Sequence, residues 1–198
     1  AAGEARHGVG RRGRRSCSGR GQLTGGAGAV EAEGDAGEIL PSTSASDPDA
    51  AFEATLRALA PVAAGFAGSW WLIGSAAARL YGAAVGPIGD IDVLLDEADA
   101  DRLSVTAGLR FGLGDPHPHF RSRRFARWGG PPLPVEFMVR FEHRTAQAWA
   151  AVQPVTRVPI DHPAGRFFVP DRHELIGIFR RFGRPKDLVR AAALERLG

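Results

Sequence analysis

The stretch "GPIGDIDVLL", residues 86–95, places two carboxylates at the start of an apolar run that is typical of a buried strand. Side chains at positions i and i+2 of a strand point to the same face, so Asp90 and Asp92 project together while Ile91 points to the other side. Two carboxylates this close repel each other, which raises the pKa of one of them unless a cation lies between them. Mg²⁺ is commonly held by one or two carboxylates together with substrate phosphates. The pair therefore predicts a site for Mg²⁺ or Mn²⁺.

The same Asp-x-Asp spacing occurs at two other places, and both favour structural roles. The pair at 47 and 49 precedes a helical pattern and is expected to cap that helix. The pair at 99 and 101 is expected to lie on a solvated helix face. Only the pair at 90 and 92 stands at the mouth of an apolar strand, where uncompensated carboxylates are costly.

Upstream, "WLIGSAAARL" (71–80) reads as a strand, a Gly-Ser step and a helix. Gly74 permits a close approach of the backbone, and Ser75 stands at a helix N-terminus, where free N–H groups favour an anion such as phosphate. We expect a phosphate cradle here, although an ordinary serine cap would give the same pattern.

A third carboxylate is expected from a neighbouring strand. Glu136 lies in the middle of the apolar run "LPVEFMV" (133–139), and Glu142 is a reserve candidate at a strand end. An exposed position on an edge strand is the alternative interpretation of Glu136.

The pattern along the chain predicts an α+β fold with a small mixed β-sheet flanked by helices. Helices are expected from residue 47 to about 62 and over 75–82, 97–108, 145–152, 171–183 and 184–198; strands are expected over 69–74, 90–95, 121–128 and 134–141, with short strands or loops over 155–160 and 166–170.

Residues 1–46 are rich in Gly, Ala, Ser and Arg and have few large apolar side chains, so we expect a disordered tail followed by one domain over 47–198. "RRGRR" (11–15) could alternatively be an arm that binds nucleic acid. Cys17 is the single cysteine, which excludes an internal disulfide, and no apolar run approaches the roughly 20 residues of a membrane span. These features favour a cytoplasmic protein without membrane contact.

Taken in order, "GSAAARLYG…GDIDVLL…VEFM" resembles the nucleotidyltransferase superfamily, the group of DNA polymerase β. The end of the chain, "VPDRHELIGIFRRFGRPKDLVRAAAL", is similar to the small bacterial AbiEii-like nucleotidyltransferases. The resemblance covers about residues 50–194.

The resemblance implies a metal-dependent transfer of a nucleoside monophosphate from an NTP to an acceptor hydroxyl. It maps Gly74 and Ser75 onto phosphate binding, Asp90 and Asp92 onto metal binding, and Glu136 onto the third metal ligand. Glu136 departs from the family's usual Asp. Relatives often carry a lysine near Phe179, for which Arg180 or Lys186 would have to substitute in nucleotide binding.

The acceptor and the partners are less defined by the sequence. Arg121, Arg123 and Arg124 form a basic cluster that could bind the phosphates of an RNA acceptor, although a solvated strand face is the alternative. Other readings are a catalytically degenerate binding module, one half of a toxin–antitoxin pair with a cognate antitoxin protein, and a nucleotidyltransferase acting on a small molecule such as an antibiotic.

Overall fold

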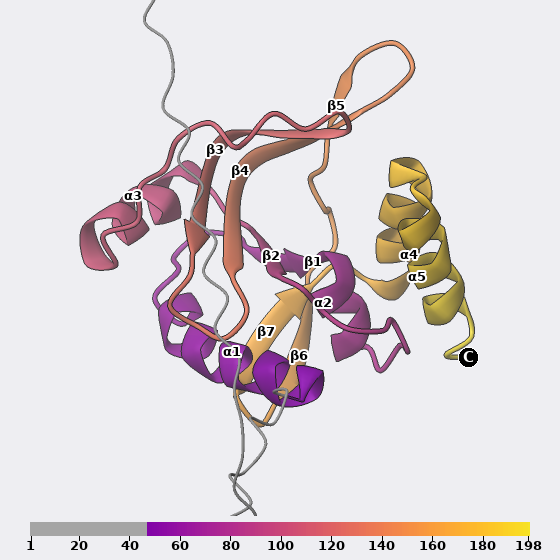
Figure 1. Ribbon diagram of the computed structural model, residues 1–198, viewed down its shortest axis with the longest axis horizontal. Coiled ribbons are helices and arrows are strands. Elements are labelled where there is room, and N and C mark those ends of the chain that lie inside the picture. Colours follow the sequence, from indigo (N-terminus) through magenta and orange to yellow (C-terminus); the bar gives the residue numbers. More distant parts are fainter. Residues whose placement is uncertain (1–46) are drawn as a thin grey trace, which may run out of the picture. The chain divides into compact units, whose positions relative to one another are not determined.

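The computed structural model describes residues 47–198, and the expected disordered tail lies outside these residues. Five helices and seven strands are present in this part of the chain, which confirms the α+β prediction (Figure 1). The helices are α1 (Pro48–Ala63), α2 (Gly74–Leu80), α3 (Glu97–Thr106), α4 (Arg172–Phe182) and α5 (Pro185–Glu195). The strands are β1 (Trp71–Ile73), β2 (Ile91–Leu94), β3 (Phe120–Trp128), β4 (Val135–Arg144), β5 (Trp149–Ala151), β6 (Val158–His162) and β7 (Gly165–Val169).

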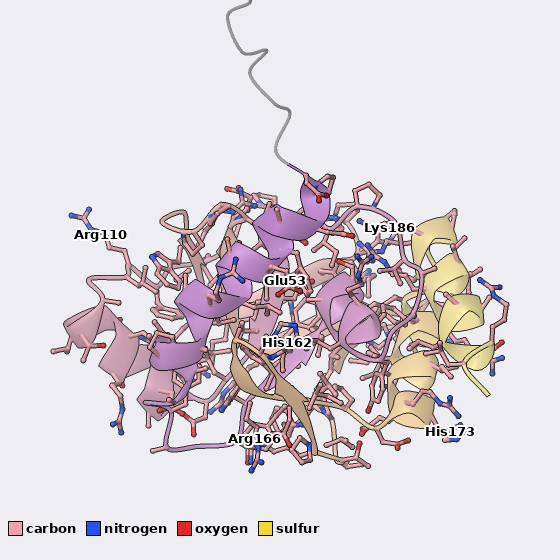
Figure 2. All side chains as sticks on the ribbon, turned by 90° about the horizontal axis from the view of Figure 1, so that it is seen from below. Glu53, Arg110, His162, Arg166, His173 and Lys186 are labelled. Atoms are coloured by element: carbon pink, nitrogen blue, oxygen red, sulfur yellow. The ribbon has the colours of Figure 1, made fainter. Side chains whose placement is uncertain are left out.

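The main sheet is mixed and has the strand order β1-β2-β4-β3. Strand β2 runs antiparallel to β1 and parallel to β4, whereas β3 and β5 both pair antiparallel with β4. Strands β6 and β7 form a separate hairpin. An ion pair between His162 and Glu53, with 3.4 Å between Nε2 and Oε1, links this hairpin to α1 (Figure 2).

Each face of the main sheet has its own core. One face packs with α1, α2 and β7 around side chains such as Leu72, Val93 and Phe137. On the opposite face, Leu94 and Met138 belong to a second cluster that includes Ile178 of α4. Helices α4 and α5 pack against each other (Figure 1). Their buried side chains, such as Leu175 and Leu194, belong mainly to the first cluster, and Ile178 of α4 reaches the second.

The helix ends follow the local sequence signals. Asp47 accepts a hydrogen bond from the backbone N–H of Asp49 at 3.0 Å, as expected for the cap of α1. Asp171 caps α4 in the same way, and Gly183 ends α4 with φ of 68°, a conformation that glycine adopts without strain.

Two predictions about these elements were wrong. Residues 145–152, expected as a helix, form a turn and strand β5, because the backbone of β4 offers unpaired groups with which Trp149–Ala151 pair.

Asp99, expected on a solvated helix face, is fully buried and accepts hydrogen bonds from the backbone N–H groups of Ala67 (3.0 Å) and Gly68 (2.9 Å). Its carboxylate holds the turn that leads into β1, a long-range role that a local pattern does not reveal.

Across residues 47–198, no helix combines the length and apolar character needed to cross a membrane.

Candidate active site

Asp92 and Glu136 lie side by side in one row across the main sheet. In the register of the strands, Asp92 pairs with Ile73 of β1 on one side and with Glu136 of β4 on the other, and Glu136 pairs in turn with Arg127 of β3. Partners in one row point to the same face of a sheet. The row thus brings Asp92 and Glu136, the predicted third acid, onto the sheet face that packs with Ile178 of α4.

Gly74 adjoins this row at the end of β1. Its φ of 64° is a left-handed conformation that side chains disfavour, and a Cβ at this position would stand under 3.0 Å from Oδ2 of Asp92. The backbone at Gly74 thus approaches the Asp92 carboxylate closely, while the phosphate cradle expected at Gly74 and Ser75 stays a prediction. Ser75 is buried in the first turn of α2, and the helix begins at Gly74 without a side-chain cap, so the ordinary serine cap is not formed.

The environment of Asp92 disfavours its charged form. Burial raises the pKa of this carboxyl most, the negative charges of Asp90 and Glu136 raise it further, and Arg190 and Arg184 partly oppose them, which leaves a pKa of about 7. A carboxyl that ionises only near neutral pH gains a strong electrostatic benefit from a nearby cation.

Glu136 already has a cationic partner, since Arg127 donates a hydrogen bond to its Oε1. This bond, and after it the charge of Glu136, raise the pKa of the guanidinium. Within the described residues, no three His, Cys, Asp or Glu side chains form a ready-made metal site. The donor set fits a divalent cation through Asp90 and Asp92, with Glu136 joining once it leaves Arg127.

Two arginines of the last helix region, missed by the sequence interpretation, also act on Asp92. Asp187 is fully buried and accepts hydrogen bonds from Arg184 Nε at 2.5 Å and Nη2 at 2.9 Å, while Arg190 Nη1 lies 3.4 Å from the same carboxylate. Both guanidiniums contribute to the electrostatics of Asp92. The spacing "RPKDLVR", with an acid three residues from each arginine, was the available signal, because such residues share one helix face.

Arg180 and Lys186, the two expected nucleotide-binding cations, have different surroundings. Arg180 pairs with Glu195 of α5, with 2.5 Å between Nη2 and Oε1, in an exposed interaction. Lys186 lies at the start of α5 (Figure 2). The pKa of His117 is lowered by burial first, and then by the charges of Arg184, His119 and Lys186.

The arginines expected to bind RNA are paired with acids. Arg121 contacts Glu142 at 2.5 Å, and Arg124 contacts Asp101 at 2.8 Å. Arg123 and Arg124 both approach Glu97, at 3.9 and 3.3 Å. These pairs offset much of the positive charge on which the RNA expectation rested.

No family model and no curated protein matches this chain. It is similar to the crystal structure of a Thermotoga maritima protein described as a candidate nucleotidyltransferase, with a TM-score of 0.53 and 18% sequence identity. The match covers 72% of this chain and 89% of that chain. The chain shares that protein's fold. Membership of the AbiEii-like group stays a prediction.

Proposed function

We propose that this chain transfers a nucleoside monophosphate from an NTP to an acceptor hydroxyl in a reaction that depends on Mg²⁺ or Mn²⁺. The observation that carries the proposal is the surrounding of Asp92: Gly74 leaves no room for a side chain on one side, and Glu136 is its neighbour in the sheet on the other. With Asp90 two residues earlier, three carboxylates lie near the first residues of the adjacent central strands β2 and β4. The fold match supports the same chemistry.

Asp90 and Asp92 would hold the cation, and Glu136 would complete its ligands. When bound, a divalent cation neutralises phosphate charge and makes an acceptor hydroxyl easier to deprotonate. Side chains and backbone groups of the protein would bind the triphosphate and accept the proton.

Arg184 and Arg190 are the cations best placed to bind the triphosphate. The buried Asp187 orients both, which reduces the freedom that each side chain would lose on binding. The backbone at Gly74 and Ser75 provides further N–H groups beside the carboxylates. Glu136 is the carboxylate available to accept the proton of the acceptor hydroxyl, provided that the acceptor displaces Arg127.

The test has two stages. Calorimetry with Mn²⁺ should show binding to the full chain and its loss in Asp92→Asn, with Asp161→Asn as a control because Asp161 is an exposed acid of the separate hairpin. The four NTPs, each labelled at the α-phosphate, are then incubated with the protein, Mg²⁺ and cell extract. Transfer of label by the unmodified chain, absent in Asp92→Asn, supports the proposal; metal binding without any transfer contradicts it.

A second candidate function is nucleotide binding without catalysis. The ion pair between Arg127 and Glu136 favours it, because a neutralised third acid is a poor metal ligand and a poor base. Binding of an NTP without transfer of label to any fraction of the extract, also after Arg127→Met frees Glu136, would support this alternative.

RNA as the acceptor, and a cognate antitoxin protein as a partner, stay predictions.

A further inference from the structure

A cavity of about 1000 Å³ opens next to the carboxylate row. Leu94 and Met138, which line it, lie two residues beyond Asp92 and Glu136 on the same strands and pair with each other in the register. Residues i and i+2 share a face and stand about 7 Å apart along a strand. A molecule in this cavity therefore lies one row away from the proposed metal site.

One part of this cavity is lined by apolar and aromatic side chains. Five of the seven buried side chains in the second core cluster contribute to it: Trp71, Leu94, Met138, Phe141 and Val152. Polar and charged side chains make up nearly half of the lining. Sites for small molecules combine apolar walls with placed polar groups, and this cavity has both.

A break in strand pairing shapes the wall of the cavity. The register of β3 and β4 pairs residues 120–122 and 124–128 of β3 but omits Arg123 and its opposite residue Arg140. Arg140 has φ of 50°, which is uncommon for a residue with a side chain. Residues held in sparsely populated backbone conformations cluster near functional sites. Both residues left out of the strand pairing, Arg123 and Arg140, line the cavity.

The charges that line the cavity are balanced. Three arginines (Arg121, Arg123, Arg140) and three acids (Asp96, Glu97, Glu142) line it. Glu97 lies 3.2 Å from Arg140 and 3.9 Å from Arg123, and Arg121 pairs with Glu142. The acids would repel a polyanion, and the arginines would repel a polycation. A ligand with one charge of each sign could contact an arginine and a carboxylate at the same time.

We propose that this cavity is the acceptor site and that the acceptor is a small zwitterionic alcohol with an apolar body. The proposal rests on the nucleotidyl transfer proposed above. The apolar part would occupy the interior between Trp71 and Phe141, the charged groups would contact Glu97 and Arg140 at the rim, and the hydroxyl would point along the sheet toward Asp92. In the transfer, the hydroxyl oxygen forms a bond to the α-phosphorus of the NTP, pyrophosphate leaves, and the hydroxyl proton passes to Glu136.

The first experiment tests binding without catalysis. Three aryl alcohols that share the phenyl carbinol but carry different charged groups are added separately to the full chain and followed by ligand-observed NMR: phenylserine (ammonium and carboxylate), 2-amino-1-phenylethanol (ammonium alone) and 3-hydroxy-3-phenylpropanoate (carboxylate alone). We expect phenylserine to bind at least about threefold more tightly than the other two, because it alone meets both signs of charge.

Variants of the cavity complete this experiment. Arg123→Ala and Arg140→Gly should each weaken phenylserine binding about threefold, and glycine tolerates the backbone conformation at 140. Arg166→Ala is the matched control, because Arg166 is also an exposed arginine paired with an acid, Asp161, but it lies on the separate hairpin. Absence of phenylserine binding, or equal loss in Arg166→Ala, overturns the proposal.

The second experiment identifies the acceptor class. The full chain is incubated with α-labelled NTPs, Mg²⁺ and a bacterial extract separated into RNA, protein and low-molecular-weight fractions. Label in the low-molecular-weight fraction, reduced in Arg140→Gly and unchanged in Arg166→Ala, supports the proposal, whereas label on RNA or protein overturns it. Intact phenylserine binding without transfer to any fraction counts against the proposed function and upholds the cavity as a ligand site.

Discussion

Gly74 and Asp92 are packed so closely that no side chain fits between them. The backbone at Gly74 is left-handed, and the carboxylate of Asp92 occupies the space that a Cβ would need. The carboxylate can take this position only because the first residue of α2 has no side chain.

We predict that Gly74→Ala weakens Mn²⁺ binding at least tenfold as well as lowering the melting temperature. The added methyl group has to displace the Asp92 carboxylate, and the left-handed conformation alone costs about 1–2 kcal/mol for alanine. Gly82→Ala is the matched control, because Gly82 has φ of 89° but no atom lies within 4 Å of the place that a Cβ would take. Calorimetry should show unchanged Mn²⁺ affinity in Gly82→Ala, and equal affinities in both variants would refute the role of Gly74.

We predict that Asp92→Asn stabilises the metal-free protein at alkaline pH. In the folded chain the pKa of Asp92 is raised from 3.8 to about 7, so the native state holds a proton that the unfolded state releases earlier. The stability of the unmodified chain should therefore fall as the pH rises from 3.8 to about 7 and stay reduced above it. Asparagine carries no charge and avoids this loss.

Melting curves in a chelator measure this difference. At pH 8 Asp92→Asn should melt several degrees higher than the unmodified chain, and the gap should close near pH 4. Saturating Mn²⁺ should raise the melting temperature of the unmodified chain but not that of Asp92→Asn. Asp161→Asn, which removes an exposed carboxylate whose pKa Arg166 lowers, should not melt higher at pH 8.

We predict that Arg184→Met and Arg190→Met weaken ATP binding about tenfold while Mn²⁺ affinity changes little. Both guanidiniums are oriented by Asp187 and act on Asp92, so their loss removes positive charge where the triphosphate would lie. Arg180→Met is the comparison, since Arg180 pairs with Glu195. A larger loss of ATP affinity in Arg180→Met would instead support the assignment made from the sequence resemblance.

We predict that Glu174→Gln costs about 2 kcal/mol of stability at pH 7. Burial alone would raise the pKa of Glu174, but hydrogen bonds from the Thr156 hydroxyl and from the backbone N–H groups of Val155 (2.7 Å) and Thr156 (2.9 Å) outweigh it and lower the pKa below 4.5. This stabilisation is complete above pH 4.5 and is lost as the pH falls through the native pKa.

Denaturant unfolding at several pH values tests this prediction. The gap between Glu174→Gln and the unmodified chain should narrow below pH 4.5. Glu195→Gln, at an exposed ion pair with Arg180, should cost less than about 1 kcal/mol. A gap that does not depend on pH would show that Glu174 acts through packing.

The sequence predicted the elements whose signals are local. The apolar run around Asp92 indicated a strand, which the structure has as β2 with Asp90 just before it, and the cap at Asp171 with Gly183 marked both ends of α4. The adjacency of Glu136 to Asp92 was a prediction about a neighbouring strand, and the register confirms it.

Features that depend on distant parts of the chain were not predictable. Trp149 lies in a segment with helical composition but forms a strand because β4 is there to pair with it. Asp99 looks like any acid on a helix surface until the turn at Gly68 supplies its hydrogen bonds. The arginines near β3 appeared as free positive charge because Glu97, their shared partner, is remote in sequence.

The parallel pairing of β2 with β4 has a consequence for the order of folding. Strands β3 and β4 can pair early across a short connection, whereas β2 meets β4 only after the chain has closed a loop that contains α3 and β3. Asp92 and Glu136 therefore become neighbours in this slow, non-local step, and the repulsion between them opposes only the last stage of assembly. A divalent cation bound there acts on the completed fold, so it should slow unfolding and leave the early hairpin unaffected.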